Sequence, residues 1–309
     1  MKRYEKFAFE AEKGIPFEVS EGTRGELIIR THNIATSNYA NPPIPEGYKH
    51  VCGEWNNGFV IERCSDGSQF VWIPVGSLDS NGTLDGKHFS GEFGRRKYGN
   101  CEFDDYKEAF TDEQSRQLSL VASRVRKYGG FYISRYNISK SSEGKPQSVK
   151  GVMPWVNVTW VEAEKIASTI EDNEAVKSHL TYGAEYDSVL EWFIKTEVKT
   201  LAEIVEDSTE WGNYRNTENS PRKVVETGSR EEWCANNIYD FAGNVNELTQ
   251  ERKIIKDTIP GCALAVLSII RGGSFYGNGS DYPVAYREKY NAIHDYNIDA
   301  GFRAALYIK

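Results

Sequence analysis

The helix signals of this chain are confined to its middle third, and short strand-like runs lie on both sides of them. Thr111 opens one helical pattern, which paired glycines at 129–130 close, because threonine caps a first turn and glycine ends a helix. A capping box at Thr159 opens a second pattern over 159–171. A third pattern covers 184–196 with apolar residues at helical spacing. Helices grouped in this way predict an α+β protein rather than a doubly wound sheet.

Runs of Val, Ile, Phe and Trp on either side of the helices predict short strands. The runs at 58–61 and 69–75 are joined by Ser-Asp-Gly at 65–67, which is typical of a hairpin turn. Similar runs at 131–136 and 301–307 predict two more strands. The sequence contains no internal repeat.

A proline-rich connector, NPPIPEG at 41–47, divides the chain. Its prolines favour an extended, stiff backbone. We therefore expect an N-terminal arm or attachment segment over 1–45 and one domain over 46–309.

Composition excludes several classes of protein. The chain has 309 residues, a formal net charge of −8 and a pI of about 5.4, so a general nucleic-acid-binding role is not expected. Its five cysteines are widely spaced without a C-x-x-C pair, which favours neither a zinc site nor a disulfide framework.

The hydropathy pattern indicates a soluble protein. The first residues lack the apolar core of a secretory signal, and the most apolar run, 262–270, is too short to cross a bilayer. We expect no membrane insertion and a protein that is cytoplasmic when made, with association with a virion as a further option.

Six short motifs follow one another along the chain: GGFYISRY at 129–136, PWVNVTWVEAEKIA at 154–167, LTYGAEYDSVLEW at 180–192, NIYDFAGNVNELT at 237–249, IIRGGSF at 269–275 and GFRAAL at 301–306. In this fixed order they resemble the formylglycine-generating enzyme, or sulfatase-modifying factor, family. The run 48–75 resembles the leader of prophage-encoded members. The resemblance implies a C-type-lectin-like fold of the formylglycine-generating-enzyme type: small antiparallel sheets with two helices, and long loops that carry the site.

The motifs also contain residues with a structural meaning. Paired glycines follow Arg271, and glycine permits positive φ or a close approach of backbone. Arg271 and Arg303 carry fork-shaped donors that can tie loops to carbonyls or carboxylates.

The residues that perform catalysis in the resembled family are missing here. Its enzymes oxidise a substrate cysteine with a copper-binding cysteine pair that lies between the RGGS and GFR motifs. In this chain that stretch, 274–299, contains no cysteine, and Cys262 precedes it. The five histidines show no grouping like the three-ligand iron site of related sulfoxide synthases. We therefore predict a protein that is not an enzyme, with a divergent oxidase or other metal-dependent enzyme on the same fold as the alternative.

The turn at 242–247 matches one that often holds a structural Ca²⁺ in the resembled family. Asn244 and Glu247 stand at the matching positions, and calcium prefers oxygen ligands. A turn held only by hydrogen bonds is the alternative. No other cofactor is predicted.

The segment 274–299 is rich in tyrosine, with five among 26 residues against 18 in the whole chain. Short polar residues surround these tyrosines, a composition typical of antibody binding loops. The alternative is that the tyrosines are half-buried strand residues. The candidate ligand-binding residues are Tyr276, Asn278, Asp281, Tyr282, Tyr286, Lys289, Tyr290, His294, Asp295 and Tyr296.

This segment also resembles the variable region of proteins diversified by retroelements, in which adenine-directed mutagenesis rewrites Asn-type codons. Tyr, Asp, Ser, His, Ile and Asn are the residue types that such rewriting yields, and the segment contains them. Lys289 fits this pattern less well. Our hypothesis is a non-enzymatic, phage or prophage receptor-binding type of protein that binds a cell-surface protein or glycan. A structural virion component, which would form oligomers through its N-terminal segment, is the third alternative.

Overall fold

A computed structural model describes residues 40–75, 93–99, 101, 106–255, 265–290 and 296–309, together with two strands further toward the N-terminus. The chain divides into two compact units, Met1–Ala35 and Thr36–Lys309. In the first unit, β1 (Phe17–Glu21) pairs antiparallel with β2 (Leu27–Thr31). The division between the units lies ahead of the proline-rich run at 41–47.

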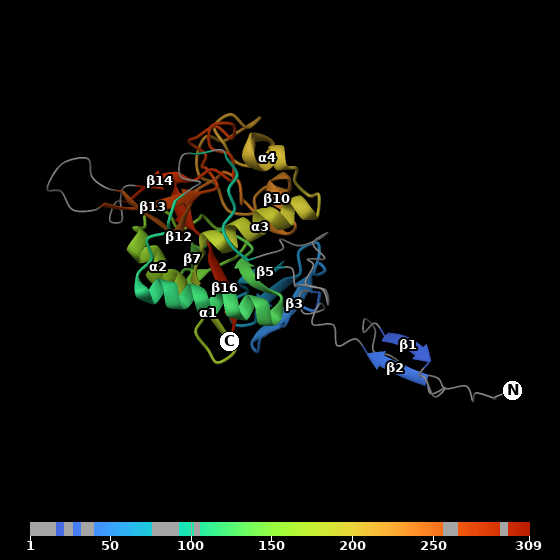
Figure 1. Cartoon of the computed structure of the whole chain (residues 1–309). Helices are drawn as coiled ribbons and strands as arrows, with labels where there is room; N and C mark the ends of the chain where they lie inside the picture. The colour runs from blue at the N-terminus through green and yellow to red at the C-terminus, as the bar shows by residue number, and fades with distance from the viewer. Residues whose placement is uncertain are drawn as a thin grey trace. The chain divides into compact units, whose positions relative to one another are not determined.

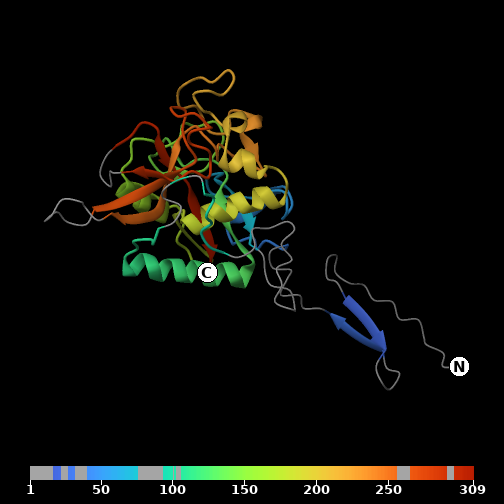
Figure 2. The same cartoon turned by 45° about the horizontal axis from the view of Figure 1, so that its top comes forward.

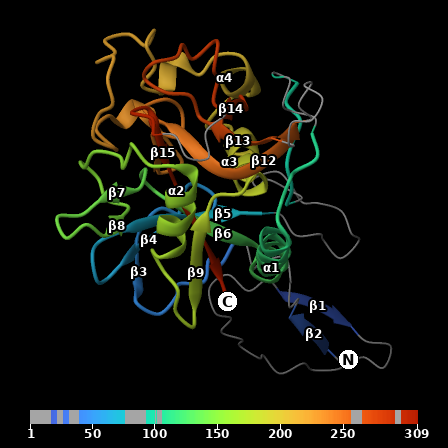
Figure 3. The same cartoon turned by 90° about the vertical axis from the view of Figure 1, so that its left-hand side faces the viewer.

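The second unit is built on a six-stranded sheet in which every neighbouring pair is antiparallel. The predicted hairpin is present as β4 and β5, and the predicted strand at 131–136 is β6 (Figure 3). The sheet runs in the order β3 (Tyr48–Cys52), β4 (Val60–Arg63), β5 (Gln69–Pro74), β6 (Gly130–Ser134), β16 (Ala304–Ile308) and β9 (Val176–Leu180).

A four-stranded sheet lies beside it and carries the loops of interest. The strand predicted at 301–307 is divided between the two sheets, as β15 and β16. Two further sheets have only two strands each. The four-stranded order is β14 (Glu288–Tyr290), β13 (Ala265–Arg271), β12 (Asn246–Ile255) and β15 (Ala300–Phe302); the small pairs are β7 (Ser139–Lys140) with β8 (Pro146–Gln147), and β10 (Cys234–Ala235) with β11 (Ile238–Tyr239).

The three predicted helices are present, and their ends follow the local capping signals. Thr111 forms a capping box with Gln114, and Gly129 ends that helix with φ of 80°. Thr159 caps the second helix, which ends at Ser168 rather than near residue 171. The helices are α1 (Asp112–Tyr128), α2 (Trp160–Ser168), α3 (Gly183–Lys195) and a short α4 (Leu201–Val205) that the sequence did not predict.

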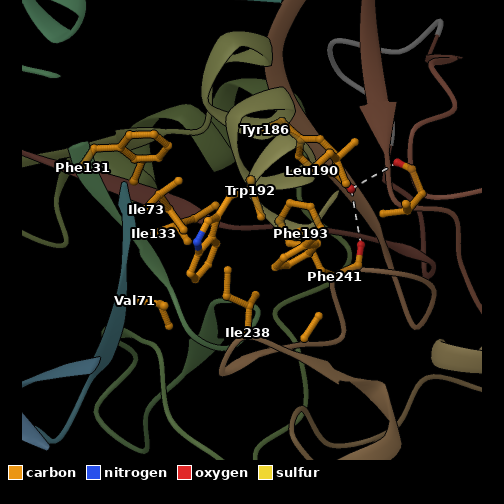
Figure 4. Packing of buried hydrophobic residues seen from close by; sticks show 14 of the residues in the cluster. Val71, Ile73, Phe131, Ile133, Tyr186, Leu190, Trp192, Phe193, Ile238 and Phe241 are labelled. Carbon is orange, nitrogen blue, oxygen red and sulfur yellow. Dashed lines mark hydrogen bonds between the residues drawn. The ribbon is translucent and has the colours of Figure 1, made fainter. Parts of the chain in front are cut away.

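The six-stranded sheet is buried on both faces, and alternate residues of each strand supply the two cores. On one face Val71 and Ile133 pack with Leu190 of α3 and with α1 (Figure 4). On the other face Trp72 and Tyr132 pack with α2. Small antiparallel sheets with helices packed on them confirm the predicted α+β architecture. No helix in the described part of the chain is long and apolar enough to span a membrane.

Loops rather than strands form the end of this unit opposite the C-terminus (Figures 1 and 2). The loops that follow α3 and the segment that follows β13 meet there. Ala285 N donates to Ile204 O at 3.1 Å, and Ser208 N donates to Gly279 O at the same distance. The segment 274–299 is therefore fixed to α4 and the turn after it.

Candidate functional site

The segment 274–299 begins at a sharp turn that requires glycine. Gly272 and Gly273 have φ of 89° and 71°. A Cβ on Gly273 would lie 2.7 Å from Tyr282 O and 2.6 Å from a ring carbon of Tyr214. Positive φ and a close backbone approach are therefore both present, which confirms the structural meaning predicted for this glycine pair.

Four fully buried charged side chains form ion pairs that fix the segment to the rest of the domain. Arg271 donates to Glu251 Oε1 at 2.6 Å and to Asp187 Oδ1 at 2.8 Å. Arg287, inside the segment, donates to Glu251 Oε2 at 2.8 Å and to Asp187 Oδ2 at 2.5 Å. Burial opposes ionisation of Glu251, but Arg287 and Arg271 outweigh it and lower its pKa to about 2. Strands β12 and β13, helix α3 and the segment are thus joined by one ion-pair network.

A further stretch before α1 covers this network. Tyr106 Oη donates to Glu251 Oε2 at 2.8 Å, and Arg96 N donates to Asp187 Oδ2 at 2.7 Å. The guanidinium of Arg95 lies 4.1 Å from the centre of the Tyr106 ring. The carboxylates consequently have donors on several sides, as buried charges require.

Some residues of the segment are buried and fix its backbone in place. Phe275, Val284 and Ala285 are buried, and Tyr186 Oη on α3 donates to Val284 O at 3.4 Å (dashed in Figure 4). Gly279 is packed so closely that a Cβ there would lie 2.4 Å from a backbone nitrogen. These positions fix the backbone from which the other residues project.

Other residues of the segment project into solvent. Tyr276 is 72% exposed and Tyr296 63% exposed, and Asp281 and Lys289 are exposed as well. The remaining predicted residues, Asn278, Tyr282 and Tyr286, are partly exposed, and the rings of Tyr282 and Tyr286 meet edge to face at 5.4 Å.

One of the predicted binding residues is in the core, so its assignment to the surface was wrong. Tyr290 is 8% exposed and belongs to the apolar cluster that includes Leu248 and Ile270. It lies in β14 opposite Ser268, where strand alternation turns Lys289 outward and Tyr290 inward. The alternative of a half-buried strand tyrosine thus holds for this position. His294 and Asp295 lie outside the described residues.

Two exposed or flanking residues were not predicted. Ile298 is 64% exposed. The composition of the segment did not indicate it as a binding residue, because its side chain is aliphatic and its neighbours are polar. Arg215, from the loop after α4, donates through Nε to Asn278 Oδ1 at 3.1 Å. No sequence spacing relates residues 215 and 278, so only the fold reveals this contact.

The two ends of the segment are joined at its base. Ser274 Oγ donates to Asp299 Oδ2 at 2.9 Å, and Asn246 Nδ2 donates to the same oxygen at 3.2 Å. The stretches carrying Tyr276 and Ile298 therefore start from neighbouring points of the scaffold.

The turn predicted for calcium is held by hydrogen bonds within the protein. Asn244, with φ of 63°, accepts at Oδ1 from Asn213 Nδ2 and from Val225 N, both at 3.0 Å. Glu247 Oε1 accepts from Asn137 Nδ2 at 2.9 Å and from Arg303 Nε. Burial raises the pKa of Glu247 to about 7, against the opposing effect of Arg303.

Calcium binding would therefore have to displace these donors and compete with a guanidinium for Glu247. Among the described residues no group of three or more His, Cys, Asp or Glu side chains is arranged to hold a metal ion. The contacts of Asn244 and Glu247 fit the hydrogen-bonded turn, and the calcium site stays a prediction.

None of the described cysteines belongs to the segment. They are Cys52, Cys64, Cys101 and Cys234. Burial raises the pKa of the Cys234 thiol, which disfavours the thiolate that binds soft metals.

Comparison with protein families gives a match over most of the chain. The model of the sulfatase-modifying factor enzyme 1-like domain matches residues 60–308. Among curated proteins no match is found.

Solved structures with similar architecture include three that differ widely from this chain in sequence. The crystal structure of CarF has a TM-score of 0.42 and 16% identity, and covers 58% of this chain and 87% of its own. Treponema denticola variable protein 1 has a TM-score of 0.39 and 14% identity, and covers 85% of this chain and 99% of its own. The M1 variant of the Major Tropism Determinant has a TM-score of 0.40 and 10% identity, and covers 97% of this chain and 74% of its own.

Proposed function

The chain belongs to the family of sulfatase-modifying factor enzyme 1-like domains, and we propose that it is a non-enzymatic member that binds a ligand through segment 274–299. One observation carries this proposal. Nine large hydrophobic side chains are exposed among the described residues, and the three most exposed are Tyr276, Ile298 and Tyr296. All three belong to this one segment.

Exposure of this kind favours binding on energetic grounds. Burying a side chain of this size against a partner contributes about 1.5–3 kcal/mol. Tyrosine adds a rigid ring and a hydroxyl, and it loses little conformational entropy on binding. The backbone beneath is held by the Arg271 and Arg287 ion pairs, so little ordering has to occur when a ligand binds.

We further propose that the segment is a variable region of the retroelement-diversified type, in a phage or prophage receptor-binding protein. The burial of individual residues supports this proposal, because exposed and buried positions of the segment differ in residue type. Exposed positions such as Tyr276 and Asp281 have residue types that adenine-directed changes yield, whereas Phe275, Val284 and Arg287 are buried framework. The ligand is then a cell-surface protein or glycan, and no cofactor takes part.

The N-terminal unit is the part that we assign to attachment or oligomerisation. Its described secondary structure is the pair β1 and β2. A two-stranded sheet has little independent stability in water, and pairing with other chains or a virion would stabilise it.

Sequencing of the DNA around the coding region tests the variable-region proposal. We expect a near-identical repeat of the codons for 274–299 next to a reverse transcriptase gene, differing mainly at adenines. Burial predicts where the differences fall: at the codons of Tyr276, Asn278, Asp281 and Tyr296, and not at that of Arg287. A repeat that differs equally at buried and exposed positions, or a locus without any repeat, would contradict the proposal.

A further inference from the structure

The exposed surface of the segment continues onto a part of the chain outside it, at the start of α2. Tyr296 Oη donates to Glu162 Oε1 at 3.4 Å, and Asn157 N donates to Asn297 O at 3.0 Å. Val161, in the first turn of α2, is 42% exposed. Residues 296–297 of the segment therefore lie against the start of α2 and the loop before it.

The side chains at this junction are apolar although they face solvent. Ile298 is 64% exposed, Tyr296 63% and Val161 42%. Exposed apolar side chains that occur singly are ordinary, but several gathered together mark an interaction surface. We call Val161, Tyr296 and Ile298 together the α2 surface.

A carboxylate, that of Glu162, lies at the edge of the α2 surface. Glu162 accepts hydrogen bonds from Thr159 N and Thr159 Oγ1, both at 2.9 Å, and these bonds lower its pKa. It is therefore ionised at neutral pH. The whole chain also carries a formal net charge of −8.

We propose that the α2 surface is a fixed part of the binding face and docks a protein partner whose contacting patch is apolar and edged by lysine or arginine. This inference rests on the proposed function, since Tyr296 belongs to both surfaces. A protein partner is favoured over a glycan by chemistry. Sugar rings are bound by flat aromatic faces and hydrogen-bonding groups, which only Tyr296 supplies, whereas the branched side chains of Val161 and Ile298 fit an apolar patch of a protein.

Two matched substitutions distinguish an effect on the α2 surface from a general effect of added negative charge. Val161→Glu replaces one apolar side chain of the α2 surface with a carboxylate, and Leu120→Glu makes the same change on α1, where Leu120 is 41% exposed. Glutamate in the first turn of a helix is favourable, so Val161→Glu leaves the fold intact. Thermal unfolding of both variants checks this.

The probes are a displayed library of random peptides and an array of free glycans, each applied to the full chain. We expect the selected peptides to combine apolar residues with Lys or Arg and to bind less tightly as salt rises. Val161→Glu is expected to weaken their binding by at least about tenfold, since it prevents burial of one aliphatic side chain. Leu120→Glu is expected to leave binding unchanged.

The possible outcomes distinguish this inference from the proposed function. Peptides that bind wild type and Val161→Glu equally overturn the inference. Glycans whose binding is lost in Tyr276→Ser but kept in Val161→Glu also overturn it, and leave the proposed function standing. If neither library yields a binder that depends on segment 274–299, both proposals fail.

Discussion

At the scale of single residues, the tyrosines of segment 274–299 differ in how far their rings reach into solvent. Tyr276 and Tyr296 are mostly exposed, Tyr282 and Tyr286 are partly covered, and Tyr290 is buried. A tyrosine that fills the core contributes to stability, whereas an exposed one contributes only when a partner covers it. Composition alone assigns all five to one class, and burial separates them.

Alanine substitutions at two of these positions should therefore differ strongly in their effect on stability. Tyr290→Ala is expected to lower the free energy of unfolding by about 3–5 kcal/mol, because it leaves a cavity beside Leu248 and Ile270. Tyr276→Ala is expected to change it by no more than about 0.5 kcal/mol. Urea unfolding of both variants measures this, and equal stability of the two would show that the burial of Tyr290 is wrong.

At the scale of elements, the segment is fixed because strand, helix and loop share one set of buried charges. Asp187 lies on α3, Glu251 on β12 and Arg271 at the end of β13. Arg287 reaches into this set from the segment itself. The loop that carries the exposed tyrosines thus gains a rigid base without a regular structure of its own.

Removal of the Arg287 guanidinium tests the role of this base. Arg287→Met is expected to destabilise the domain by about 3–5 kcal/mol, because Asp187 and Glu251 each lose a buried ion pair. Lys289→Met, two residues further and exposed, is the matched control and should change stability by no more than about 0.5 kcal/mol. Hydrogen exchange of 274–290 should rise in the first variant. Unchanged exchange there would mean that the ion pairs do not hold the segment.

The elements also show which parts of the structure can be predicted from the sequence. Helices α1, α2 and α3 were predicted because capping residues such as Thr111 and Thr159 act within a few positions of the helix they begin. The sequence predicted that Arg271 can bind carboxylates, which is confirmed, but not which ones, since the members of the ion-pair network are separated by up to 100 positions and only the tertiary fold joins them. The same holds for the contact of Arg215 with Asn278, and for the burial of Tyr290, which depends on the pairing of β14 with β13.

At the scale of the whole molecule, the stability and the proposed binding surface of the Thr36–Lys309 unit lie in different regions. Both faces of the six-stranded sheet are covered by cores that include α1, α2 and α3. The loops at the other end are then free to vary on a scaffold that already has its stability. Under the proposed function, this separation lets the loops carry the binding surface while the cores supply the stability.

The most direct measurement compares wild type with a variant in which Tyr276→Ser, Tyr296→Ser and Ile298→Ser are combined. We expect the melting temperature to change by only a few degrees, because all three side chains are mostly exposed. Binding to whatever the peptide library or glycan array identifies for wild type is expected to be lost. Retained binding, or a variant that fails to fold, would contradict the account of 274–299 as a ligand-binding surface on an independent scaffold.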